Sequence, residues 1–179
     1  MLKADVVYNI DDAIIKDTIS ISRNSYPPGW SCGDSEACYS QAFTKQGNIL
    51  IMLRDNERNV GFLFAVPHND AVEDLKNDDP LMKEDAGTYY VQNSAILPAF
   101  RRKLALGKIL ALLREELRKR SIFTVSMHAR VSNGLSRTIQ DHLKIVEIRR
   151  IDIWKYYGNE EPTDYIVAEW PHEKKLQWG

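Results

Sequence analysis

Three consecutive cations, Arg101, Arg102 and Lys103, stand between an extended apolar pattern and a helical one. Residues 89–97 read as a strand, because tyrosines and aliphatic residues dominate until a proline ends it. Leucines then recur in steps of three and four, which predicts a helix over residues 109–120. A helix N-terminus offers free backbone N–H groups and the positive end of a dipole. The cationic loop therefore predicts an anion site, and three cations together favour a polyphosphate.

The elements before this loop are a strand, a helix, a second short helix that runs through Ala42, and a hairpin. Residues 2–8 are predicted as a first strand, and Asp11 or Asp12 caps a helix that a pair of prolines ends. Residues 48–53 and 60–66 read as two strands joined by a polar turn, which is the pattern of a hairpin.

An acidic connection, residues 67–87, joins this hairpin to the strand before the cationic loop. It holds seven acids against two lysines and one histidine. Connections of this length are uncommon unless they are functional or contain a short helix. Two interpretations stay open: a solvated acidic loop, or a surface that attracts a cationic substrate.

Residues 121–131 alternate in polarity, as a half-buried strand does. The apolar face carries Phe123, Val125, Met127 and Ala129, and the polar face carries Thr124, Ser126, His128 and Arg130. Ser132 or Asn133 then caps a helix to about residue 143. Residues 145–157 hold one long strand or two, and residues 165–170 form the last strand.

This order of elements predicts an α/β (α+β) fold in a single domain, residues 1–179. Parallel pairing is expected only across the βαβ unit of residues 89–131, because the later strands are joined by short connections. The result is a mixed, mostly antiparallel sheet with helices on both faces and a central βαβ unit.

Composition excludes several classes of protein. The chain has 179 residues, 44% of them hydrophobic and 27% charged, with a net charge of −1, so neither a nucleic-acid nor a membrane partner is expected. A signal-peptide pattern and an apolar run of about 20 residues are both missing, which favours a cytoplasmic protein. Cys32 and Cys38 lie in one loop without a nearby histidine, so free thiols or a disulfide are expected rather than a metal site. The chain is expected to be a monomer or a homodimer.

Three stretches resemble one family. Residues 93–103, followed by a helix that ends in three cations, resemble the acetyl-CoA-binding motif of the GNAT superfamily of N-acetyltransferases. Residues 128–133 resemble the second motif of that superfamily, in which an Asn opens a helix after a strand. Residues 149–150, 156–157 and 164–167 resemble the C-terminal part of the ribosomal-protein N-terminal-alanine acetyltransferases. The resemblance covers roughly residues 60–170.

The resemblance implies acetyl-CoA as cosubstrate. In this superfamily, backbone amides of the strand before the loop hold the pantetheine and the thioester carbonyl, and the corresponding residues here are Ser94, Ala95 and Ile96. The Asn that opens the second helix is Asn133. The pyrophosphate would lie on the loop and the helix start, which comprise Arg101, Arg102, Lys103, Leu104, Ala105, Leu106, Gly107 and Lys108.

The family's loop pattern, Arg/Gln-x-x-Gly-x-Gly/Ala, fits this chain in two frames. Without a gap it covers residues 101–106 and places a leucine at both glycine positions. With one inserted residue it covers residues 102–107 and places Ala105 and Gly107 there. The first frame keeps the helical stripe in register, and the second keeps small residues that let phosphates approach the backbone. Both frames stay open.

The resemblance also assigns catalytic positions. The alanine acetyltransferases place a Glu general base where this chain has His128, and an imidazole can accept a proton at neutral pH. Their proton-donating Tyr corresponds to Gln140, which cannot release a proton. Tyr156, Tyr157 or water would then protonate the leaving thiolate, or it leaves unassisted.

The sequence therefore predicts an acetyl-CoA-dependent N-acetyltransferase. Its acceptor would be a primary amine of a protein N-terminus, a lysine or a small molecule, attacking directly in a ternary complex. The alternative is a degenerate member that binds a CoA thioester without turnover. A nucleic-acid-binding module ranks below both, because an apolar stripe interrupts the basic residues and the chain is net acidic.

Overall fold

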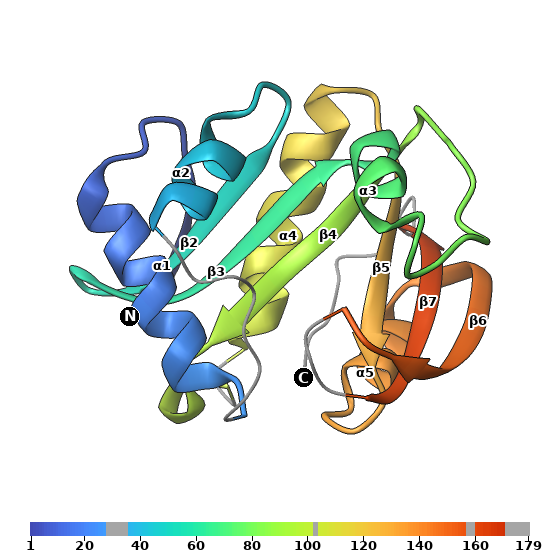
Figure 1. Cartoon of the computed structure of the whole chain (residues 1–179). Helices are drawn as coiled ribbons and strands as arrows, with labels where there is room; N and C mark the ends of the chain where they lie inside the picture. Colours follow the sequence, from blue (N-terminus) through green and yellow to red (C-terminus); the bar gives the residue numbers. More distant parts are fainter. Residues whose placement is uncertain (28–35, 102–103, 157–159, 171–179) are drawn as a thin grey trace.

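A seven-stranded sheet forms the centre of the computed structural model, which describes residues 1–27, 36–101, 104–156 and 160–170 (Figure 1). The strands are β1 (Leu2–Val7), β2 (Ile49–Asp55), β3 (Arg58–Pro67), β4 (Thr88–Ile96), β5 (Thr124–Arg130), β6 (Lys144–Trp154) and β7 (Glu161–Glu169). Their order across the sheet is β1-β2-β3-β4-β5-β7-β6, and only β4 and β5 pair in parallel. The predicted mixed sheet with its central βαβ unit is confirmed.

Helices cover both faces of the sheet (Figure 1). They are α1 (Asp12–Ser25), α2 (Glu36–Thr44), α3 (His68–Leu75), α4 (Ala105–Lys119) and α5 (Leu135–His142), with a short 3-10 turn at Pro98–Phe100. The first core cluster packs α4 and α5 against one face, and the second packs α1, α2 and α3 against the other. Alternate residues of one strand therefore enter different cores.

Local signals explain how several elements begin. Asp11 caps α1, since its carboxylate accepts the Ile14 N–H at 2.9 Å. The N-cap of α5 is Gly134, with a φ of +75°, and not Ser132 or Asn133 as predicted, although Asn133 accepts the Leu135 N–H at 2.9 Å. The β2–β3 hairpin forms as predicted, with Asn56 in a left-handed conformation at its turn.

Three predicted boundaries were wrong. Helix α4 begins at Ala105, one turn before Ile109, because the preceding leucine stripe already packs on the sheet. Phe123 lies before β5 and is 44% exposed. Strand β7 begins at Glu161 rather than Tyr165, because its first residues pair with both neighbouring strands.

Strands β4 and β5 separate after a short paired stretch. They pair only from Thr88 opposite Thr124 to Tyr90 opposite Ser126, although both strands continue further. On its other side β4 stays paired with β3, where a register shift leaves Gln92 as an extra residue. Figure 1 shows the two strands side by side at one end and apart at the other.

The described part of the chain has neither a helix that could span a membrane nor a group of side chains placed to bind a metal. Within it, no helix is long and apolar enough to cross a membrane. The same residues contain no group of three or more His, Cys, Asp or Glu side chains placed to hold a metal ion. Cys32 and the side chain of Cys38 lie outside what the structure describes, so the prediction about their thiols stays a prediction.

Candidate functional site

The edge of β4 that faces β5 carries the first candidate groups. Gly61 pairs with Ile96, and the Leu97 N–H donates to the Val60 carbonyl, so Leu97 faces β3. Since backbone groups alternate between the two sides of an antiparallel strand, those of Ser94 and Ile96 face the opening. Of the predicted pantetheine-binding residues, Ser94 and Ile96 thus present their backbone to the gap. Ala95 is buried in the second core cluster.

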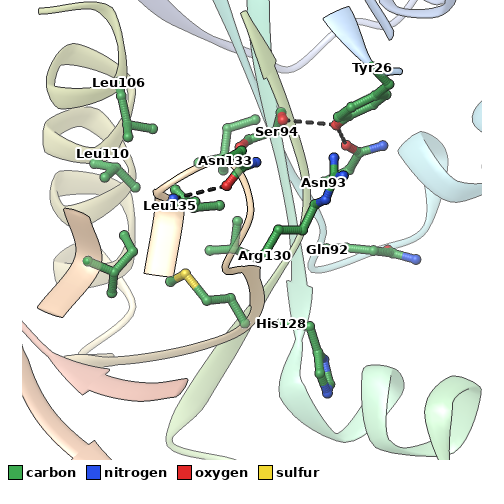
Figure 2. A pocket seen from close by; sticks show the side chains of 14 residues that line it. Tyr26, Gln92, Asn93, Ser94, Leu106, Leu110, His128, Arg130, Asn133 and Leu135 are labelled. Atoms are coloured by element: carbon green, nitrogen blue, oxygen red, sulfur yellow. Dashed lines mark hydrogen bonds between the residues drawn. The ribbon is translucent and has the colours of Figure 1, made fainter. Parts of the chain in front are cut away.

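A cavity fills the opening between the two strands and encloses about 670 Å³, including its part open to solvent. Its apolar wall lies on the α4 and α5 side and comprises Leu63, Leu106, Leu110, Met127, Leu135 and Ile139. Tyr26, Asn93 and Arg130 lie opposite this wall (Figure 2), whereas Asn133 lies beside Leu135, just before α5. A long, partly apolar molecule with polar groups along one side would suit this space.

Two side chains already contact the open edge of β4. The Tyr26 hydroxyl donates to the Ser94 carbonyl at 2.8 Å and also to the Asn93 side chain (Figure 2). Arg101 donates from Nε to the Ile96 carbonyl at 3.0 Å and from its guanidinium terminus to the Ser25 carbonyl at 2.5 Å. Arg101, predicted as a phosphate ligand, therefore ties β4 to the end of α1.

The N-terminus of α4 lies at the wider end of the cleft. Leu104 precedes the helix with a φ of +56°, a left-handed conformation that favours glycine. Leu104 is the first glycine position of the ungapped frame, so the backbone favours that frame. Ala105 and Gly107 are buried, Leu106 lines the cavity and Lys108 is exposed. Arg102 and Lys103 lie outside the described residues.

A charged pair closes the β5 side of the cleft. Figure 2 shows Arg130 reaching from β5 towards Asn93 of β4. Its Nε donates to Glu161 of β7, and Ser132 donates to the same carboxylate at 2.7 Å. The side chains of Arg130 and Glu161 are each 15% exposed, so the pair is mostly shielded from water.

His128 lies where the cleft begins and turns away from the apolar wall (Figure 2). Its Nδ1 is 2.8 Å from the Tyr90 hydroxyl, and its Nε2 is 3.0 Å from Oδ2 of Asp79. The ring stacks on Trp154, with centroids 4.0 Å apart. Because its side chain is only 1% exposed and both nitrogens are hydrogen bonded, a proton can reach it only through a neighbouring group.

The charges around His128 determine its tautomer. Burial alone would raise the pKa of Asp79, but hydrogen bonds from His128 and Arg149 outweigh burial and hold that pKa at about 2. An ionised carboxylate only accepts, so Nε2 of His128 carries the hydrogen and Nδ1 accepts from Tyr90. Burial lowers the pKa of His128 and raises that of Tyr90, so the imidazole is neutral and the phenol protonated at neutral pH.

A second buried histidine lies beside this group. His68 Nε2 is 3.0 Å from the Lys83 carbonyl and its Nδ1 is 2.7 Å from the Ser126 hydroxyl. Ser126 is in turn hydrogen bonded to Tyr165, whose pKa burial raises to about 12. These groups satisfy one another inside the core, so this histidine holds α3 to the sheet.

The other predicted catalytic positions differ in placement. Tyr156 is 37% exposed and its ring lies 5.9 Å from Trp154, so it stands at the margin of the His128 group. Gln140 is exposed and bonds to Ser136, away from the cavity lining. Tyr157 lies outside the described residues.

Sequence reasoning missed Tyr26, Asp79, Tyr90 and Arg149. Asp79 was one of seven acids in the connection, and only the fold distinguishes it, by burying it to 2% exposure. The acidic connection is therefore not wholly a solvated loop. One signal was available for Tyr90, which stands in the strand predicted before the cationic loop. In the structure Tyr90 and its neighbour Val91 face opposite cores.

Comparison with known proteins places the architecture. No family model and no curated protein sequence matches the chain. Among solved structures, the ribosomal-protein-S18-alanine N-acetyltransferase from Escherichia coli is similar with a TM-score of 0.63 at 17% identity, covering 99% of this chain and 97% of that one.

Two further solved structures are similar in fold to this chain. The PaiA N-acetyltransferase from Thermoplasma acidophilum, in complex with coenzyme A, has a TM-score of 0.63 at 10% identity and covers 94% of this chain and 99% of its own. The aminoglycoside 6'-acetyltransferase type Ii has a TM-score of 0.67 at 13% identity, with 96% and 99% covered. The fold of this chain is that of the GNAT acetyltransferases.

Proposed function

We propose that this protein is an acetyl-CoA-dependent N-acetyltransferase that transfers the acetyl group to a primary amine in a ternary complex. The observation that carries the proposal is the separation of β4 and β5 after Tyr90 and Ser126. It leaves backbone groups of β4 that no strand pairs with facing a partly apolar cavity that ends at a helix N-terminus. The fold shared with N-acetyltransferases supports the same conclusion.

The cofactor would lie along the open edge of β4. Ser94 and Ile96 offer backbone groups to the amides of a pantetheine arm, as an additional strand would use them. The pyrophosphate would meet the free N–H groups at the start of α4, aided by the cations Arg102 and Lys103. Asn133 lines the other side of the cleft.

Proton transfer would use His128 through Tyr90. The ammonium of the acceptor must lose a proton to become the attacking amine, and the imidazole is the neutral base of the site. Tyr90 donates to Nδ1 but is buried outside the cavity lining, so a water would have to carry the amine's proton to the Tyr90 oxygen as the Tyr90 proton moves to His128. Tyr156, whose ring centroid lies 5.9 Å from that of Trp154, would protonate the thiolate.

A second candidate function is thioester binding without turnover. The Ser94 and Ile96 carbonyls are already bonded by Tyr26 and Arg101, and Leu104 stands where a glycine would admit phosphate. These features would weaken cofactor binding, and the exposed Gln140 supplies no proton. The two functions differ in turnover alone.

Calorimetric titration with acetyl-CoA tests both functions. We expect binding at a stoichiometry of one, weakened by replacing Arg102 and Lys103 together with Ala. Arg101 is unsuitable for this purpose, because its guanidinium holds α1 to β4. No binding at millimolar cofactor would exclude both functions.

Release of free thiol in the presence of peptides, lysine derivatives and small amines then separates enzyme from binder. We expect His128→Ala to lower kcat by roughly 100-fold or more while leaving the affinity for acetyl-CoA nearly unchanged. An unchanged rate would remove His128 from the mechanism. Binding without thiol release for every amine would leave the second function.

A further inference from the structure

We infer that Asp79 and Arg149 are positioning residues that set the basicity of His128 in opposite directions. This inference deepens the proposed function, because it concerns the group assigned there to accept the proton. Neither residue reaches the cavity lining, so both would act through the imidazole. Asp79 comes from the acidic connection and Arg149 from β6, so the pair also links two distant segments to β5.

Four hydrogen bonds fix the position of Asp79 and the orientation of its carboxylate. Its Oδ2 lies 3.0 Å from Nε2 of His128 and 2.6 Å from the guanidinium of Arg149. Its Oδ1 accepts the Leu81 N–H at 3.2 Å, and its own N–H donates to Leu75 at 2.8 Å. With the side chain 2% exposed, water cannot replace these partners.

Every element packed against His128 contributes a group that bears on its charge. The acidic connection contributes Asp79 and β6 contributes Arg149, the two ionised groups. Tyr90 of β4 and Tyr165 of β7 are neutral phenols, with ring centroids 5.7 and 5.1 Å from the imidazole. His68 of α3 is neutral as well, because burial lowers its pKa.

The two ions act in opposite directions on the imidazolium that would form during turnover. A carboxylate at hydrogen-bond distance stabilises it and keeps the ring in the Nε2–H tautomer. A guanidinium on the same oxygen partly cancels that effect. Removing the carboxylate charge should therefore lower the pKa of His128, and removing the guanidinium should raise it. If the pair had only a structural role, both substitutions would shift the pKa of His128 in the same direction.

The test is an NMR titration of His128 in the full chain, which requires no substrate. We expect Asp79→Asn to shift the His128 midpoint to lower pH and Arg149→Met to shift it to higher pH. Asp78→Asn is the matched control, because this neighbouring acid is exposed and should leave the midpoint unchanged. Asp79→Asn should also lower kcat by roughly 100-fold, with KM for acetyl-CoA within about threefold of wild type.

The outcomes separate this inference from the proposed function. A His128 midpoint that is the same in Asp79→Asn, Arg149→Met and wild type would overturn the inference. If Asp79→Asn fails to fold, ¹⁵N shifts of the wild-type imidazole decide, and a proton on Nδ1 would overturn it. Opposite shifts in a protein that turns over no amine would support the inference and sink the proposed enzyme.

Discussion

Leu104 is a branched residue in a conformation that glycine adopts more readily. Its φ of +56° brings Cβ close to the following carbonyl, at a cost of about 1–2 kcal/mol. The side chain is 50% exposed, so it recovers little of that cost by burial. The strain lies at the turn into α4, where the proposed pyrophosphate site begins.

Replacing Leu104 with Gly should stabilise the protein by about 0.5–1 kcal/mol, since relief of strain outweighs the added freedom of the unfolded chain. Urea unfolding measures the change. Leu104→Ala keeps the Cβ and is the matched control, expected to stay within about 0.5 kcal/mol of wild type. Equal stabilisation by Ala and Gly would show that the backbone here is not strained.

At the scale of elements, Arg101 joins the end of β4 to the end of α1. Its hydrogen bonds to the Ile96 and Ser25 carbonyls satisfy a strand edge and a helix C-terminus at once. Tyr26, the residue after α1, adds a bond to Ser94 in the same place. The open edge of β4 is thus held by one helix end before any ligand arrives.

Arg101→Ala should lower the free energy of unfolding by about 1 kcal/mol, because two charge-assisted hydrogen bonds of an exposed side chain are lost. Arg101→Lys should recover only part of this, since an ammonium cannot reach both carbonyls in the fork geometry. Arg118→Ala, in the last turn of α4, is the control. If chemical unfolding shows the same loss of free energy for Arg101→Ala as for Arg118→Ala, Arg101 does not stabilise the contact between β4 and α1.

The whole molecule should lose stability in acid in two stages. Burial lowers the pKa of both His68 and His128 below the ordinary value of 6.5, so the native state binds these protons less readily than the unfolded chain. That stability is present above pH 6.5 and is lost as the pH falls towards the depressed values. Asp79 stabilises the folded protein above its ordinary pKa of 3.8, and this stabilisation is lost as the pH falls towards its folded-state pKa of about 2.

The free energy of unfolding should therefore fall as the pH drops below about 6.5, where the two histidines dominate. Below about pH 4 Asp79 should remove about 2 kcal/mol more. Urea unfolding across this range measures both stages, and His68→Gln should flatten the first. A profile that stays flat down to pH 5 would show that neither histidine is held neutral by burial.

Local patterns in the chain were enough for much of the fold. The strand–loop–helix of residues 89–120 was predicted because period-two and helical patterns meet there at a proline. The alternation that put Met127 and His128 on opposite faces held, since β5 packs its two faces against different cores. The later strands were found, although the start of β7 was missed.

The site was less accessible to such reasoning, because its contacts join residues far apart in the chain. Asp79 and His128 are 49 positions apart, and Tyr26 and Ser94 are 68. No pattern in the sequence distinguishes Asp79 from the other acids of its connection, whereas burial beside an imidazole does. The same holds for Arg101, whose type suggested phosphate binding and whose contacts are two backbone carbonyls.

The sequence by itself determined the elements, the order that makes one parallel pair and the position of a cationic helix start, because these depend on neighbours along the chain. Only the tertiary structure decided how far β4 and β5 stay together, which side chains bond the open edge and which charges surround His128. Those features depend on packing between segments, and burial then changes what the same side chains can do.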